Sequence, residues 1–160
     1  MFFRALPVGA FFILAACAGP APQPGVSTAP TGAMTDRPIA EAESLLVTRL
    51  EELGFTVEDR PETGVVAAII ERGAPAEWAF CDRIQVSERD DRNRTHWAEA
   101  ETLKVQVNVR LSELGGGTSV TVSPRYSGIY LNRFDNLSFE RLCASAGVLE
   151  PLILAKVEDS

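Results

Sequence analysis

Histidine and lysine are nearly absent from this 160-residue chain, which has one histidine, His96, and two lysines, Lys104 and Lys156. A single histidine excludes a histidine-dependent catalytic triad or a multi-histidine metal site within one chain. Residues 90–93 are charged, but they lack the spaced oxygen ligands and terminal glutamate of an EF-hand. We therefore predict no metal site, no cofactor and no enzymatic activity.

Basic residues are also too few to form a patch. Lysine and arginine total 15 against 22 aspartate and glutamate, a formal net charge of −7. An acidic surface disfavours nucleic acid and anionic lipid headgroups as partners. The arginines alternate with acids along the chain, which is typical of a solvated face.

Long apolar runs are lacking too, and the longest stands at the start of the chain. Residues 5–16 are too few to cross a bilayer but have the length of a secretory apolar region, and Arg4 precedes them. The run ends in Leu14-Ala15-Ala16-Cys17. This stretch resembles the lipobox of bacterial lipoproteins.

The resemblance implies that a peptidase cuts before Cys17, that Cys17 carries acyl chains, and that these chains hold the protein on a bilayer. Ala18 stands where such lipoproteins often carry an aspartate for inner-membrane retention. We therefore expect a periplasm-facing anchor in the outer membrane, with the outer leaflet of the inner or cytoplasmic membrane as the alternative. A different alternative is an ordinary secretory signal peptide with a fortuitous cysteine.

Composition divides the chain into three parts. We predict a signal peptide at 1–16, the lipidated cysteine and a tether rich in Pro, Ala and Gly at 17–36, and a single domain at 37–160. Removing residues 1–16 takes away Arg4 and leaves 14 basic and 22 acidic residues, a formal net charge of −8.

The three cysteines favour one disulfide. Lipidation of Cys17 leaves Cys81 and Cys143 as an even pair in an oxidising compartment, so we predict a bond between them. Two buried free thiols are the alternative, because the sequence does not give the distance between their Cα atoms.

Hydrophobic periodicity predicts the elements of the domain. A helical repeat follows Pro38, with Asp36 as its N-cap and Gly54 as its left-handed C-terminal glycine. Period-two runs predict strands at 55–59, 65–71, 78–86 and 103–111, and a further one after the Gly115-Gly116-Gly117 turn. A final helix begins after Ser145, with its inner face formed by Val148, Leu149, Leu152, Ile153 and Val157.

These elements define an α+β class: an antiparallel sheet of four to five strands with the N-terminal and C-terminal helices packed on one face. Residues 126–142 have no clear period and are interpreted as a strand extension followed by a loop or short helix. Sheet order is left open.

Two groups of residues are candidates for partner binding. The strand at 65–70 is apolar on both faces, so Val66, Ala68 and Ile70 either form a contact strip or belong to the core. The second group contains Tyr130 and Phe134, in a cluster of aromatic residues and arginine that is typical of contact surfaces and equally of packed covers. Packing is favoured for both groups.

The remaining candidates for chemistry are weak. Glu99 and Glu101 point to the same side of a strand, but their exposed surroundings do not favour an acid–base pair. The helix ending at Leu50–Phe55 and the order helix, strands, helix are similar to small envelope lipoproteins, including accessory lipoproteins of the outer-membrane β-barrel assembly machine. We expect a non-enzymatic domain that binds or scaffolds another envelope component. The alternative is a small periplasmic hydrolase or ligand-binding protein with an acidic and arginine-containing cleft.

Overall fold

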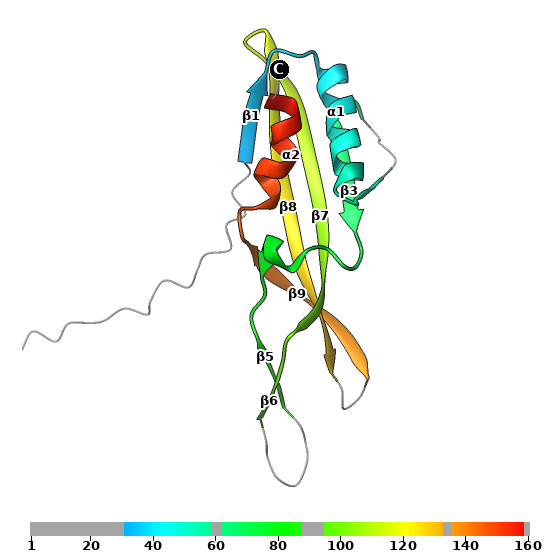
Figure 1. The fold of residues 1–160 in the computed structure, drawn as a ribbon, viewed down its shortest axis with the longest axis vertical. Coiled ribbons are helices and arrows are strands. Elements are labelled where there is room, and N and C mark those ends of the chain that lie inside the picture. Colours follow the sequence, from blue (N-terminus) through cyan, green and yellow to red (C-terminus); the bar gives the residue numbers. More distant parts are fainter. Residues whose placement is uncertain (1–30, 59–61, 88–94, 133–135, 159–160) are drawn as a thin grey trace, which may run out of the picture.

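The computed structural model describes residues 31–58, 62–87, 95–132 and 136–158. Seven strands form an antiparallel sheet in the order β2-β3-β7-β8-β9-β4, with β1 also paired to β8, and β5 and β6 form a separate hairpin (Figure 1). In chain order the elements are β1 (Thr31–Thr35), α1 (Ile39–Glu52), β2 (Thr56–Val57), β3 (Val65–Ile70), the 3₁₀ turn η1 (Ala76–Trp78), β4 (Ala79–Phe80), β5 (Ile84–Ser87), β6 (Thr95–Ala98), β7 (Ala100–Leu114), β8 (Gly117–Asn132), β9 (Leu137–Ser145) and α2 (Leu149–Glu158).

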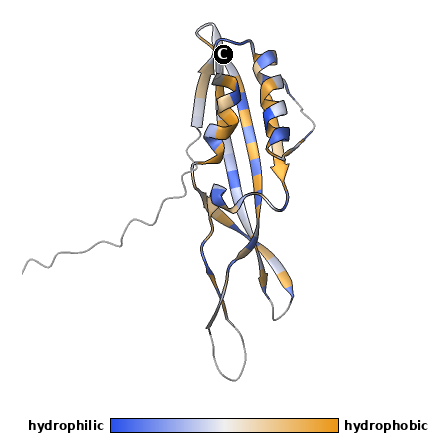
Figure 2. Cartoon of the chain, in the orientation of Figure 1, coloured by the Kyte–Doolittle hydropathy of each residue, from blue (hydrophilic) through white to orange (hydrophobic). Residues whose placement is uncertain are grey.

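The long β7–β8 hairpin forms the centre of the sheet. Apolar and polar residues alternate along β7, as the orange and blue bands of Figure 2 show. Burial alternates with them, so one face of β7 is buried and the other is more exposed. Gly115 and Gly116 form its two-residue turn with φ of 63° and 92°. Positive φ at both positions suits glycine and matches the twist of a tight hairpin.

Both helices cover the same face of this sheet. α1 contacts β3 and β7, α2 contacts β1 and β8, and the two helices contact each other (Figure 1). Leu46 and Leu50 of α1 and Leu149 and Ile153 of α2 are fully buried against the inward valines of β7 and β8. The α+β class and the placement of both helices agree with the sequence analysis.

The end of α1 is also as predicted. Gly54 has a φ of 89°. Its N–H donates to the carbonyl of Glu51 at 2.9 Å, and the N–H of Phe55 donates to that of Leu50 at 2.9 Å. These two bonds form a Schellman cap. Phe55 is thereby turned into the core, where its ring stacks on Trp78 with the centroids 6.0 Å apart.

The structure corrects the predicted number of strands and their limits. The sheet has seven strands instead of four to five. Thr31–Thr35, placed in the tether, forms β1 along β8. The strand extension predicted after Tyr126 is confirmed, since β8 continues to Asn132, but residues 137–142 belong to β9 instead of a loop or helix. These segments contain many small and polar residues, so their sequences lack the pattern of a half-buried strand. They form strands because β8 lies beside them and pairs with them.

Three smaller expectations are also wrong. The predicted strand at 78–86 is split into β4 and β5, which pair with different partners. Pro38 occupies the N-cap position of α1, without a side-chain bond, in place of Asp36. Val148 precedes α2 and is 39% exposed, because the helix begins only at Leu149.

Candidate functional site

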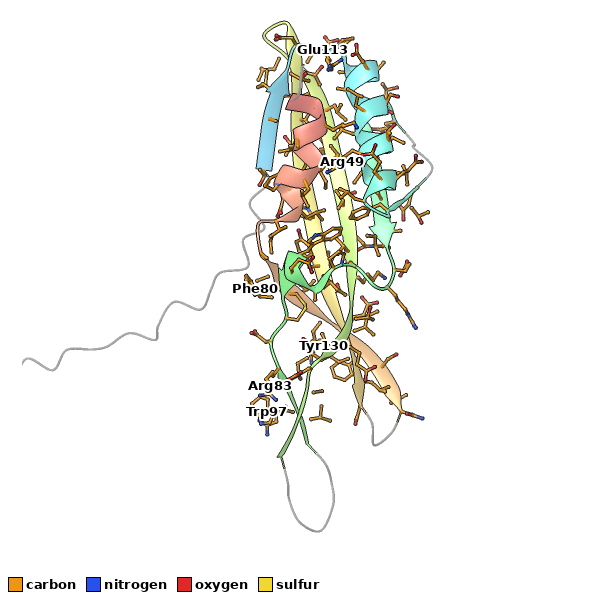
Figure 3. The ribbon with its side chains drawn as sticks, in the orientation of Figure 1. Arg49, Phe80, Arg83, Trp97, Glu113 and Tyr130 are labelled. Carbon is orange, nitrogen blue, oxygen red and sulfur yellow. A yellow bond between two sulfur atoms is a disulfide. The ribbon has the colours of Figure 1, made fainter. Side chains whose placement is uncertain are left out.

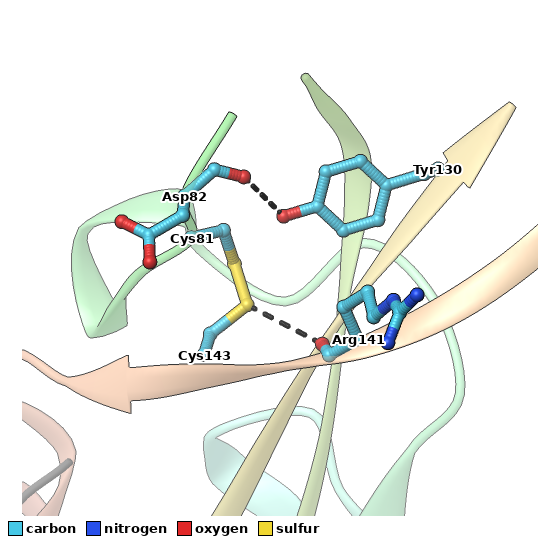
Figure 4. Close-up of a disulfide and its surroundings, with 5 residues drawn as sticks. All are labelled: Cys81, Asp82, Tyr130, Arg141 and Cys143. Atoms are coloured by element: carbon cyan, nitrogen blue, oxygen red, sulfur yellow. Dashed lines mark hydrogen bonds between the residues drawn. A yellow bond between two sulfur atoms is a disulfide. The ribbon is translucent and has the colours of Figure 1, made fainter. Parts of the chain in front are cut away.

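The disulfide joins two segments that are distant in sequence. Cys81 and Cys143 are 62 positions apart, and their Cα atoms are 4.6 Å apart (Figure 4). Phe80 of β4 lies opposite Ala144 of β9, so the next antiparallel position brings the two cysteines together. The bond predicted from the cysteine count therefore links the short edge strand β4 to β9.

Tyr130 lies buried beside this disulfide. Only 1% of the residue is exposed, and its hydroxyl donates to the carbonyl of Asp82 at 2.7 Å (Figure 4). Its ring stacks on Phe139, with the centroids 5.6 Å apart. Burial, and then the negative charge of the Asp82 carboxylate, raise the pKa of its phenol. The contact interpretation of Tyr130 is therefore wrong, and Phe134 falls outside the described residues.

Val66, Ala68 and Ile70 do not form a contact strip either. Val66 is fully buried and Ala68 is 3% exposed, while Ile70 is partly buried and packs against the core. Each lies opposite an inward valine of β7, on the face that the helices cover. On the other face of β3, Val65, Ala67 and Ile69 are half-buried, so only one of its two apolar faces belongs to the core.

Exposed apolar side chains lie instead on the strands that adjoin the disulfide and on the β5–β6 hairpin. Four large ones come from β4, β6 and β9, and sequence reasoning did not select them. They are Phe80 (70% exposed), Trp97 (58%), Leu137 (63%) and Leu142 (60%). Phe80 and Trp97 project outward from the ribbon in Figure 3. We call these four residues the disulfide-end apolar group.

Part of this group shares the sheet face that the helices leave open. Cys143 is buried toward the helices, so its neighbours Leu142 and Ala144 face the other way. Phe80 lies opposite Ala144 and therefore shares that face. Phe80 and Leu142 are thus diagonal neighbours on the outer face, within reach of one contacting residue.

A hollow of about 510 Å³ lies next to the disulfide. Most of its lining is small or apolar, including Ala74, Ala79 and Leu103. Arg83 and Glu99 form an exposed ion pair at its edge, with Nε and Oε1 3.0 Å apart. Glu101 lines the same hollow, so the structure brings together both glutamates considered from the sequence. Its volume is in the range of small-molecule sites.

Two clusters of polar side chains link the sheet to neighbouring segments, one between the sheet and α2 and one on its exposed face. The buried carboxylate of Glu150 accepts from the hydroxyls of Ser145 at 2.7 Å and Tyr126 at 3.4 Å. Burial is the main cause that raises the pKa of Tyr126 to about 12. On the exposed face, Lys104 bridges Glu71 and Glu140, and the bond to Glu71 raises the pKa of its ammonium group.

No known protein-family model matches the chain, and no curated protein matches it. Within the described ranges, no three His, Cys, Asp or Glu side chains are grouped so that they could hold a metal ion. No helix among the described residues is long and apolar enough to span a bilayer. His96 lies in β6 opposite Val86, and its side chain is outside the description. The candidate site is therefore the disulfide end of the sheet, with its apolar group and hollow.

Proposed function

We propose that this chain is an envelope lipoprotein, anchored through acylated Cys17 on the periplasmic side of the outer membrane, whose domain binds another envelope protein. The observation that carries the binding role is the disulfide-end apolar group. Four large apolar side chains, each at least 58% exposed, lie on β4 and β9, the strands that the disulfide links, and on β6. Aromatic anchors with apolar neighbours are the usual energetic centres of protein interfaces.

The fold also limits how far the domain reaches from the bilayer. Because β1 begins at Thr31, only residues 18–30 separate it from Cys17. A proline-rich segment of this length spans at most about 40 Å when extended. The partner would therefore be membrane-embedded or held close to the same membrane.

Placement of a photo-reactive amino acid tests the binding role in native membranes. We expect Phe80 and Trp97 positions to crosslink to a protein partner, and Leu114 to give none. Leu114 is 59% exposed and is the matched control, since it ends β7 at the far hairpin turn, nine residues beyond the level of Cys143 and about 30 Å from it along the strand. Equal crosslinking at Leu114 would show a non-specific apolar contact and contradict the proposal.

The anchor is tested separately. Replacing Cys17 with alanine should release the protein from the membrane fraction, and mass analysis of the native mature form should find acyl chains on residue 17. An unmodified first residue, or a retained leader, would contradict the lipoprotein assignment. Any crosslinked partner would then have to be sought away from the membrane surface.

The hollow beside the disulfide supports a second candidate, a small ligand-binding protein or hydrolase. Ala79→Leu would place a larger side chain in this hollow, next to the disulfide. A co-purified small molecule seen by native mass spectrometry, and lost in Ala79→Leu but kept in an Ala67→Leu control, would favour this candidate over a protein scaffold.

A further inference from the structure

One side of β9 is open. On its other side β8 pairs with it from Leu137 to Cys143. On the open side β4 pairs only with Ala144 and Ser145. Throughout the portion of the chain that the structure describes, no strand pairs with this side between residues 138 and 142.

The hydrogen-bond pattern shows which backbone groups face the open side. The N–H of Ala146 donates to the carbonyl of Trp78 at 3.0 Å. Antiparallel bonding repeats every second residue, so Ala144 occupies the next bonded position, opposite Phe80. The same parity continues beyond β4 to Leu142, Glu140 and Ser138. Their N–H and C=O groups therefore continue the ladder that β4 begins.

The chain leaves this edge immediately after the disulfide. The carbonyl of Asp82 accepts from the Tyr130 hydroxyl, and the chain then enters β5, which pairs with β6. The disulfide holds the end of β4 in place at Cys81. None of the strands in the described ranges thus takes the position in line with β4 beside residues 138–142.

Sheet edges are usually protected by proline, charged side chains, bulges or very short strands. The charged residues of this edge are Glu140, which pairs with Lys104, and Arg141. Residues 137–142 contain no proline or lysine, and Leu137 and Leu142 are 63% and 60% exposed. Water can satisfy the exposed donors and acceptors one by one, and an extended polypeptide backbone is the partner that matches the whole alternating row.

We propose that an extended segment of the envelope partner adds to β9 as a further strand in line with β4. This inference rests on the proposed function and assigns its contact. On the outer face the segment meets Leu142 and Glu140, and on the inner face the exposed Arg141. Opposite-charge neighbours favour a cross-strand pair. The segment therefore carries a basic residue on the outer face beside Glu140 and an acidic residue on the inner face beside Arg141.

A second copy of the chain fits this edge poorly. The antiparallel register that overlaps all of residues 138–142 places Glu140 opposite Glu140 of the second copy. Like charges directly opposite each other destabilise a strand pair. Charge complementarity thus favours a different polypeptide.

Crosslinking from two positions of the full-length lipoprotein in its native membrane tests strand addition. A photo-reactive residue is placed at Ser138 or at Leu142. An added strand predicts that the two sites map to one short partner segment, at positions about four residues apart, because neighbouring strands advance together. Capture of a partner without this spacing does not support the inference.

A proline substitution at the open edge, compared with alanine at the same position, tests whether a backbone N–H of β9 binds the partner. Glu140→Pro removes an N–H that faces the open side, and the β8–β9 ladder does not use it. Glu140→Ala keeps that N–H and loses the same ion pair with Lys104. We expect Glu140→Pro to lower the crosslinking yield at Leu142 about tenfold relative to Glu140→Ala, the effect of losing roughly 1.4 kcal/mol.

Folding of each variant is checked by the thermal midpoint and by the absence of free thiols. If Glu140→Pro does not fold, Ser138→Pro with Ser138→Ala replaces it nearer the end of the strand. Equal yields for the proline and alanine variants, scattered crosslinks, or crosslinks to a second copy would overturn strand addition. Crosslinks to a partner at Phe80 and Trp97 would then still support the proposed function. If no position gave a crosslink to a partner, both the strand addition and the proposed function would be contradicted.

Discussion

Gly128 is one residue that the disulfide end requires. A Cβ added there would lie 2.9 Å from Cβ of Ala100, 2.9 Å from Cε2 of Tyr130 and 3.1 Å from Sγ of Cys143. The glycine thus makes room for the tyrosine ring beside the disulfide. We expect Gly128→Ala to lower the free energy of unfolding by about 1 to 3 kcal/mol, as overpacking does. Denaturant unfolding measures this, with Ser127→Ala on the opposite face as control, and equal stabilities would contradict the close packing.

Tyr126 predicts a dependence of stability on alkaline pH. Its pKa is raised from 10.0 to about 12, so the folded chain holds the phenol proton more tightly than the unfolded chain. This contribution to the free energy of unfolding is complete below pH 10 and is lost as the pH rises toward 12. We expect Tyr126→Phe to flatten the loss of stability above pH 10.

The chain has two tyrosines, so phenolate absorbance checks this prediction directly. Both should ionise above the ordinary tyrosine range in the native protein, since the pKa values of Tyr126 and Tyr130 are both raised. Both should ionise in the ordinary range in denaturant. A native titration that coincides with the denatured one would refute the burial of both phenols.

At the scale of elements, the two faces of β3 are not equivalent. Ala68 faces the helices and is buried, while its neighbour Ala67 is half-buried on the opposite face. An unpaired carboxylate in the core is strongly unfavourable. We expect Ala68→Glu to destabilise the fold by about 3 kcal/mol or more and Ala67→Glu by far less. Thermal denaturation of the two variants compares the faces, and similar midpoints would show that α1 does not cover β3.

For the whole molecule, the disulfide restricts the unfolded chain. It closes a loop with a sequence separation of 62, for which the chain-entropy relation gives about 4 kcal/mol. We expect a reductant to lower the denaturation midpoint of the mature protein and to expose two thiols. Unchanged stability after complete reduction would show that β4 is held on β9 by packing instead.

Local signals in the sequence were sufficient for several elements. The helical repeat before Gly54, the alternation at 103–111 and the glycine turn after it each depend on residues close together in the chain, and each formed as predicted. The disulfide followed from counting cysteines. The strands β1 and β9 were missed and the end of β4 was misplaced, because these segments lack strong alternation and are held by strands distant in sequence.

The candidate site could be inferred only in part. Val66, Ala68 and Tyr130 have the composition of contact residues, yet they are buried, because composition does not show which face a helix covers. Phe80, Trp97 and Leu142 carry no motif, and their exposure depends on where neighbouring strands end.

Short stretches of sequence were thus enough to predict the two helices and the central hairpin, because each depends on neighbouring residues, and composition alone fixes the acidic net charge. Strand order, the open side of β9 and the position of the hollow depend on contacts between segments many residues apart. Such contacts are selected by the packing of the whole chain, so they became visible in the folded molecule alone.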